Sequence, residues 1–336
     1  MVKSYIKDIS YYIPEKILSN GELVAEFPEW TVEKIAQKVG VEQRHIAAEN
    51  ETSTDMAVKA AEKLFFNRPE ISQDKIDFIL LCTQSPDYLL PTSACLVQNK
   101  LGLRTDIGAL DFNLGCSGFV YGLSLAKGLI AGNIATNVLL LTAETYTKHL
   151  HPKDKGNRTI FGDGATATLV STEGFAEIGN FALGTDGRGA ENLIIKSGGA
   201  RMYDKSGIVD FDENGNPIST DYLYMNGSEI FTFTQRNVPK VVKETLERNN
   251  LMQDDIDAFI MHQANSYMLE FLRKKMKIDK DRYIVDMSET VNTVSNSIPI
   301  VMARAMEKRE LRGNVLICGF GVGYSWGATL LKFDNN

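Results

Sequence analysis

The sequence lacks the features that mark several classes of protein. Its four cysteines are too few and too scattered for a disulfide framework, and none belongs to a C-x-x-C pair of the kind that binds zinc. No apolar run approaches the length of a membrane span, and the first residues, MVKSYIKDISYYIPE, lack the apolar core of a signal peptide. We therefore expect a cytoplasmic protein with reduced cysteines, no metal and no membrane association.

Positive charge is also in short supply. Lys and Arg number 36 against 43 Asp and Glu, a net charge of −7, whereas a nucleic-acid-binding protein usually carries a basic face. We expect no nucleic-acid partner. The rest of the composition, 43% hydrophobic and 24% charged, is ordinary for a globular protein. The length of 336 residues suits two domains or a fused pair of similar halves.

Strand-like and helix-like segments alternate along most of the chain, which indicates an α/β fold. In the first half, strands are predicted at 76–83, 108–114, 137–144 and 164–170, with helices after Pro91 and after Cys116. In the second half, strands are predicted at 256–263, 283–287, 313–320 and 326–333, with helices from about Ser266 and Thr293.

The two halves also share short sequences. Three segments recur in the same order, DKIDFILLCTQ as DDIDAFIMHQ, NVLLL as NVLIC and ATL as ATL, at offsets of 180, 177 and 161 residues. Chance would explain any single match, but three matches in the same order favour an ancient duplication. We therefore predict two similar α/β halves, 1–175 and 176–336, related by a pseudo-twofold axis.

The stretch DFNLGCSGFVYGLSLAKGL places one cysteine, Cys116, between a predicted strand and a predicted helix. Its small neighbours would let a substrate carbonyl approach the thiol. A helix N-terminus lowers the pKa of a thiol toward neutrality, and the backbone N–H of Cys116 is one possible donor to an oxyanion. The alternative is an inert buried cysteine, which is the default for Cys82, Cys95 and Cys318.

The duplication relates Cys116 to two residues of the second half. Cys116 and Asn292 lie 21 and 22 residues before the paired NV strands, and His262 ends a strand whose counterpart ends near Cys82. Because open α/β sheets bind ligands beyond the carboxyl ends of their strands, cysteine, histidine and asparagine are expected to meet in one pocket. Taken singly, Asn292 is as readily a helix cap and His262 a structural residue. The other histidines lie in polar loops and are expected at the surface: His45, His149 and His151.

Five segments together resemble a known family. GCSGF, FGDGATA, HQAN, VNTVSNSIP and GFGVGYSWG span most of the chain and are similar to thiolase-fold condensing enzymes, specifically β-ketoacyl-acyl-carrier-protein synthase III. The resemblance implies a thiolase-like α/β fold and a catalytic triad of Cys116, His262 and Asn292. It places the backbone oxyanion donors at Cys116 and Val322. It also implies substrate contacts by Leu90, Phe161, Lys38, Lys155, Tyr324 and Asn265, and carrier-protein docking by Arg273, Lys274 and Lys275.

The reaction implied by this resemblance is a decarboxylative Claisen condensation. Cys116 would take an acyl group from acyl-CoA, and a malonyl group on acyl carrier protein would then lose carbon dioxide and attack the acyl-cysteine. The product would be a β-ketoacyl thioester of fatty-acid or related acyl-product biosynthesis. Coenzyme A enters only as a substrate thioester, no metal or organic cofactor is implied, and the family resemblance suggests a homodimer.

Some positions depart from the family pattern. Tyr267 and Thr232 stand where basic residues are common, Val322 replaces a glycine, and Leu90 replaces an aromatic residue, which suggests a deeper acyl tunnel. The turn-rich segment 198–227 is longer than a minimal synthase needs and suggests a lid or a dimer contact. Two alternatives stay open: an acyltransferase that passes the acyl group to an amine or hydroxyl without decarboxylation, and a non-catalytic partner subunit.

Overall fold

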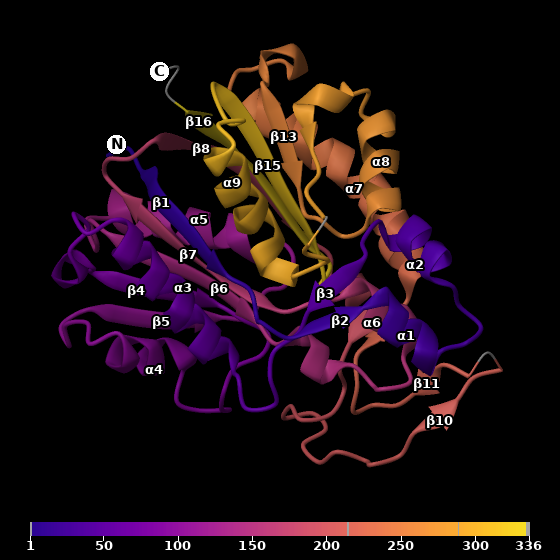
Figure 1. Ribbon diagram of the computed structural model, residues 1–336. Helices are drawn as coiled ribbons and strands as arrows, with labels where there is room; N and C mark the ends of the chain where they lie inside the picture. Colours follow the sequence, from indigo (N-terminus) through magenta and orange to yellow (C-terminus); the bar gives the residue numbers. More distant parts are fainter. Residues whose placement is uncertain (1, 214, 288, 334–336) are drawn as a thin grey trace.

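The computed structural model describes residues 2–213, 215–287 and 289–333, apart from the side chain of Lys38 (Figure 1). In this part of the chain, ten strands form one sheet in the order β14-β13-β15-β16-β8-β1-β7-β6-β4-β5. The strands of the first half are β1 (Tyr5–Tyr12), β4 (Phe78–Cys82), β5 (Gly108–Phe112), β6 (Val138–Glu144) and β7 (Gly164–Ser171). Those of the second half are β8 (Ala176–Thr185), β13 (Ala258–Met261), β14 (Tyr283–Ile284), β15 (Asn314–Gly321) and β16 (Ser325–Phe333).

The strand order is symmetric about its centre. Reading outward from the β1–β8 pair, each half presents two antiparallel neighbours and then two parallel ones, β1-β7-β6-β4-β5 on one side and β8-β16-β15-β13-β14 on the other. The seam itself joins only Tyr5 with Glu177 and Ile6 with Ala176. Two similar α/β halves about a pseudo-twofold axis are therefore confirmed, while the boundary at residue 175 stays a prediction.

One hydrogen-bond pattern explains part of the sequence repeat. In the first half, the Asp77 carboxylate accepts from the backbone N–H of Asn137 at 2.9 Å, and Asn137 Nδ2 donates to the carbonyl of Lys75 at 3.0 Å. In the second half, Asp257 accepts from the N–H of Asn314 at 2.8 Å, and Asn314 Nδ2 donates to a backbone carbonyl at 2.9 Å. The shared ID and NV residues thus clamp the starts of equivalent parallel strands.

The two halves of the ten-stranded sheet form two layers, with helices between them and over their outer faces. α3 (Ser53–Asn67) and α4 (Ser93–Lys100) pack on the first half, and α7 (Gly227–Arg248) and α8 (Ser266–Lys275) lie on the opposite side of the molecule over the second (Figure 1). α5 (Gly118–Ala131) and α9 (Ser297–Glu307) share one apolar cluster with strands of both halves. The result is a five-layer α-β-α-β-α arrangement with α5 and α9 in the middle.

Smaller elements surround the mouth of the future site. α2 (Val32–Val39) packs on α8, and α1 (Asn20–Glu26), α6 (Lys155–Ile160), β2 (Ile17–Ser19) and β3 (Gln43–His45) lie below it in Figure 1. The long segment at 198–227 forms a small ribbon of β10 (Asp210–Phe211) with β11 (Pro217–Ile218), and its last strand, β12 (Tyr224–Met225), pairs with β9 (Leu193–Ile194). Its predicted role as a lid or dimer contact stays a prediction.

Candidate active site

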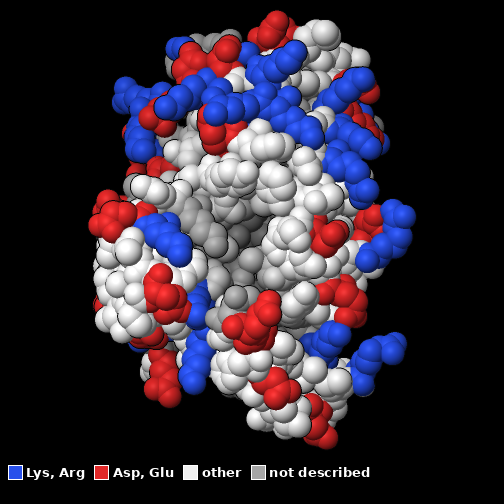
Figure 2. Space-filling model, turned by 90° about the vertical axis from the view of Figure 1, so that its right-hand side faces the viewer, with Lys and Arg blue, Asp and Glu red and all other residues white. Residues whose placement is uncertain are grey.

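A cavity of about 130 Å³ lies where the two halves meet, and Cys116, His262 and Asn292 all line it. Apolar side chains provide most of the remaining wall: Tyr146, Ile160, Phe161, Leu193, Met225, Ile230, Met268 and Phe320. A second cavity of about 300 Å³ shares four lining residues with the first and opens between α2, α7 and α8. Figure 2 shows this side of the molecule hollowed at its centre. The inner cavity is therefore reached through an outer one.

Cys116 lies between β5 and α5, two residues before the helix begins. A turn closed by the Gly118 N–H and the Gly115 carbonyl at 2.8 Å directs the chain into the helix. Cys116 is only 7% exposed, and its side chain packs against β15 of the other half. A Cβ on Gly321 would lie 2.9 Å from Cys116 Cβ and 3.0 Å from its Sγ, so only glycine allows this approach.

The protonation of Cys116 differs from the sequence-based expectation. Burial, with a smaller contribution from the Glu144 carboxyl, raises the pKa of the Cys116 thiol to about 12. The expected lowering toward neutrality was wrong because loss of hydration outweighs the helix N-terminus. Cys116 is therefore a thiol at neutral pH, and its predicted role as the nucleophile would require the loss of that proton.

His262 follows β13 and is held on two sides. Its backbone N–H donates to the Cys318 carbonyl at 2.8 Å, and its Nδ1 lies 2.7 Å from Ser297 Oγ. Ser297 Oγ also accepts the Gln263 N–H at 3.3 Å, so its own hydrogen is free to donate to Nδ1. This assigns the hydrogen of the neutral ring to Nε2. Burial lowers the pKa of His262 to about 3, so the ring is neutral at physiological pH.

Asn292 is fixed by both its backbone and its side chain. Its N–H donates to the Ile160 carbonyl and its carbonyl accepts from Gly162, both at 3.1 Å. Its Oδ1 accepts the Val294 N–H at 2.9 Å, which leaves Nδ2 as the donor for a ligand. Val294 has φ 57°, the left-handed region that a β-branched residue rarely adopts. Such strain persists where surrounding structure fixes a functional geometry.

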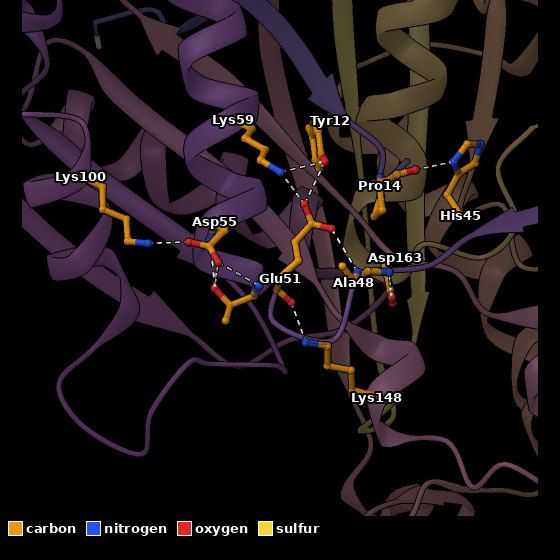
Figure 3. A network of polar contacts seen from close by, with 12 residues as sticks. Tyr12, Pro14, His45, Ala48, Glu51, Asp55, Lys59, Lys100, Lys148 and Asp163 are labelled. Atoms are coloured by element: carbon orange, nitrogen blue, oxygen red, sulfur yellow. Dashed lines mark hydrogen bonds and ion pairs between the residues drawn. The ribbon is translucent and has the colours of Figure 1, made fainter. Parts of the chain in front are cut away.

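Phe161 reaches the cavity through a segment that the first half anchors (Figure 3). Asp163 accepts from the backbone N–H groups of Ala47 and Thr147 at 2.8 and 2.9 Å. Lys148 donates to the carbonyl of Glu51 at 2.6 Å, and the carboxylate of Glu51 in turn binds Lys59 and Tyr12. The loop before α3 therefore holds the segment 147–163 against the cavity.

Comparison with known proteins identifies the group to which this site belongs. Residues 110–187 match 3-oxoacyl-[acyl-carrier-protein] synthase III, and residues 246–333 match its C-terminal part. The β-ketoacyl-[acyl-carrier-protein] synthase III of Oleidesulfovibrio alaskensis is 37% identical over 98% of this chain and 99% of that protein. The chain belongs to the β-ketoacyl-acyl-carrier-protein synthase III family.

Solved structures agree with this assignment. A crystal structure of a 3-oxoacyl-(acyl-carrier-protein) synthase III is 47% identical, with a TM-score of 0.95 over 98% of this chain and 100% of that one. The priming β-ketosynthase of the R1128 polyketide biosynthetic pathway is 26% identical, with a TM-score of 0.85 over 99% and 97% of the two chains. The thiolase-like fold expected from the sequence is confirmed.

The structure separates the other residues that the synthase III resemblance suggested as substrate contacts. Phe161 and Asn265 line the inner cavity, and Asn265 also caps α8 by accepting the Met268 N–H at 2.8 Å. Three residues do not line it: Lys155 is ion-paired with Glu29, Tyr324 stacks on Phe233, and Leu90 is 78% exposed. The side chain of Lys38 lies outside the described part of the chain, so its predicted contact stays a prediction.

Val322 and the basic residues of α8 do not line the inner cavity. Val322 packs beside the apolar cluster that includes Cys116, and its N–H as an oxyanion donor stays a prediction. Arg273 donates to Glu270 and to the Ile278 carbonyl, so it holds the end of α8 together. Lys274 and Lys275 are exposed in the last turn of α8. Figure 2 shows Lys and Arg side chains gathered above the hollow.

Several functional neighbours were missed from the sequence. Ser297, which orients His262, lies in the quoted segment VNTVSNSIP, but only the fold shows which serine meets the ring. His149, expected at the surface, is half-buried with Nε2 3.1 Å from Ser85 Oγ.

Among the residues that the structure describes, no group of three or more His, Cys, Asp or Glu could hold a metal ion. No helix within the same residues is long and apolar enough to cross a membrane.

Proposed function

We propose that this protein is an initiating condensing enzyme, which joins an acyl group from acyl-CoA to a malonyl group carried by acyl carrier protein. The product is a β-ketoacyl thioester for fatty-acid or related acyl-product biosynthesis. The supporting observation is the shared cavity of about 130 Å³, which brings the Cys116 thiol of one half to the His262 and Asn292 donors of the other. Its named relatives carry the same function in their names.

In the first half-reaction, Cys116 Sγ attacks the acyl carbonyl and a sulfur–carbon bond forms. The carbonyl oxygen becomes an oxyanion, which the backbone N–H groups of Cys116 and Val322 would stabilise. The carbon–sulfur bond to coenzyme A then breaks, and the thiol proton of Cys116 leaves with the coenzyme A sulfur. The two N–H donors therefore act in the same step in which the buried thiol loses its proton.

In the second half-reaction, the thioester carbonyl of the malonyl group accepts hydrogen bonds from His262 Nε2 and Asn292 Nδ2. Loss of carbon dioxide places a negative charge on that oxygen as an enolate, and the two donors stabilise a charge that develops only in the transition state. The enolate carbon attacks the acyl-cysteine, and Cys116 leaves and regains a proton. A neutral His262 suits this role because it donates without adding a charge. No metal or organic cofactor takes part in these steps.

The expected partners follow from the surface. Lys274 and Lys275 are exposed in the last turn of α8, the helix whose first turn lines the outer cavity, and they suit the acidic surface of a carrier protein. Tyr88, Leu89 and Leu90 are 62%, 79% and 78% exposed, an apolar loop that a second copy of the chain would cover. We therefore propose a cytoplasmic homodimer that receives its malonyl group from acyl carrier protein.

The test combines two measurements on the purified protein. With acyl-CoA alone, intact mass spectrometry should show one acyl adduct, which Cys116→Ser abolishes and which Cys95→Ser leaves unchanged. Adding malonyl-acyl-carrier protein should release carbon dioxide and remove the adduct. Adduct formation without carbon dioxide release would favour transfer to an amine or hydroxyl, and the absence of any adduct would favour the non-catalytic alternative.

A further inference from the structure

A buried asparagine at the start of α9 joins the two halves of the protein. Asn296 is fully buried, and its Nδ2 donates to the carbonyls of Gly164 at 3.0 Å and Thr293 at 2.9 Å. Its Oδ1 accepts the hydroxyl of Thr142 at 2.6 Å. Thr142 lies on β6 and Gly164 begins β7, so both belong to the first half, whereas Asn296 belongs to the second. The Asn296 amide therefore fastens the start of α9 to the sheet of the other half.

Helix capping does not account for this side chain. An asparagine at a helix N-cap usually accepts a backbone N–H from the first turn of the helix. Asn296 occupies the N-cap of α9, yet its side chain binds groups outside the helix. Burying an amide is costly unless its polar atoms are hydrogen-bonded, and here both Nδ2 hydrogens and Oδ1 have partners. Asn296 thus serves the loop before the helix.

That loop carries Asn292, and one peptide group connects the two asparagines. The carbonyl of Thr293 accepts both the backbone N–H of Asn296, at 3.1 Å, and its Nδ2. The N–H of the same peptide group belongs to Val294 and donates to Asn292 Oδ1 at 2.9 Å. This peptide group precedes the left-handed conformation of Val294, at φ 57°, which a β-branched residue rarely adopts. Asn296 holds the oxygen of the peptide group, and Asn292 is oriented by its nitrogen.

We propose that Asn296 is a positioning residue for decarboxylation, which fixes the peptide group between Thr293 and Val294 and thereby directs Asn292 Nδ2 into the cavity. The inference rests on the proposed function, since it takes Asn292 as a donor to the malonyl thioester. Without the Asn296 amide, Val294 relaxes to a negative φ, its N–H turns away from Asn292 Oδ1, and the donor loses its direction. Cys116 lies on a different loop, between β5 and α5, and keeps its place.

The test compares two variants of the same buried network. Thr142 Oγ1 lies 2.6 Å from Thr166 Oγ1, and because Thr142 gives its hydrogen to Asn296, Thr166 donates to Thr142. Thr166→Val therefore removes a buried hydroxyl of the network and leaves the Asn296 contacts in place. Asn296→Ala should slow carbon dioxide release about a hundredfold, the usual effect of a misplacement of about 1 Å, while acylation of Cys116 by acyl-CoA stays near the natural rate. Thr166→Val should leave both half-reactions near their natural rates.

A double variant tests whether Asn296 acts through Asn292. Once Asn292→Ala has removed the donor, adding Asn296→Ala should slow carbon dioxide release little further, because the two residues act as one unit. Full additivity of the two losses would overturn the inference, and so would equal loss of acylation and decarboxylation in Asn296→Ala. Asn296→Leu, whose side chain branches at the same atom, replaces the alanine variant if that protein does not fold.

Crystal structures of the variants give a readout that needs no substrate. Val294 should have a negative φ in Asn296→Ala and keep its left-handed conformation in Thr166→Val. A left-handed Val294 that survives the loss of Asn296 would overturn the inference. If the natural protein released no carbon dioxide, the proposed function would fail, and these structures would still decide whether Asn296 holds the loop.

Discussion

Asn292 turns its side-chain oxygen onto the backbone N–H of Val294, 2.9 Å away, and so reserves its amide nitrogen for the cavity. Asn292→Ala should therefore slow decarboxylation by roughly a hundred- to a thousandfold, the usual effect of losing one such donor, and leave acylation of Cys116 largely intact. Asn292→Asp is the matched variant: it keeps an acceptor for Val294 but puts a carboxyl in place of the amide donor, so decarboxylation should be lost here too while acylation persists. Carbon dioxide release and intact mass report the two half-reactions. Equal loss of both would indicate a collapsed pocket.

His262 should make the folded state sensitive to acid. Its pKa is about 3 in the folded protein and about 6.5 when unfolded, so below pH 6.5 the unfolded chain binds a proton that the folded one refuses. The stability contribution is complete above pH 6.5 and is lost as pH falls toward 3. From pH 8 to pH 5, the free energy of unfolding should fall by about 2 kcal/mol more in the natural protein than in His262→Gln. Denaturant titrations at both pH values would show parallel changes if the ring were charged in the fold.

Gly321→Ala should displace the nucleophile. The new Cβ would lie 2.9 Å from Cys116 Cβ, which forces either the thiol or β15 to move. Overpacking of this kind typically costs about 1–3 kcal/mol of stability. We expect slower acylation of Cys116 and a lower melting temperature. Gly128→Ala is the control, because a Cβ there meets nothing within 4 Å; acylation that is unaffected by Gly321→Ala would contradict the close contact.

Leu90 is expected to set acyl chain length from a second subunit. It is 78% exposed in its own chain and absent from the cavity wall, so it can act on the tunnel only across a dimer. We predict that the natural protein loads medium or branched acyl-CoA at least as well as acetyl-CoA, since each added methylene contributes about 0.8 kcal/mol in an apolar pocket. Leu90→Phe should shift loading back toward acetyl-CoA.

The control for this prediction lies within one chain. Leu193→Ala enlarges the cavity wall directly and should favour longer acyl groups whatever the oligomeric state. A strict acetyl preference in the natural protein that Leu90→Phe leaves unchanged would remove the support for a deeper tunnel.

The sequence predicted the positions of those site residues that follow directly from where strands end and helices begin. The predicted duplication placed Cys116, His262 and Asn292 beyond equivalent strands, and the structure brings them to one cavity, although their roles stay predictions. Properties that depend on three-dimensional packing were beyond it. Helix position alone suggested a reactive thiol, but full burial raises the pKa of Cys116.

Long-range side-chain choices were equally hidden. Lys155 was expected at the substrate, yet it pairs with Glu29, more than a hundred positions earlier in the chain. The backbone at Val294 takes a conformation that its β-branched side chain argues against, and only the surrounding contacts explain it. The local sequence pattern indicates which helix or strand a residue begins or ends. Its side-chain partners and its backbone strain depend on the tertiary packing.

Asp77 binds Asn137 in one half, and Asp257 binds Asn314 in the other. Both contacts hold the N-terminal ends of matching parallel strands. The C-terminal ends of the equivalent strands β4 and β13 carry different residues. Cys82 corresponds to His262, at the same offset of 180 residues that relates Asp77 to Asp257. The Cys82 thiol donates to the Leu114 carbonyl. The two halves thus keep the same scaffold while their cavity ends differ. In the proposed mechanism one half supplies the attacking sulfur and the other half supplies the donors, so neither half would be active without its twin.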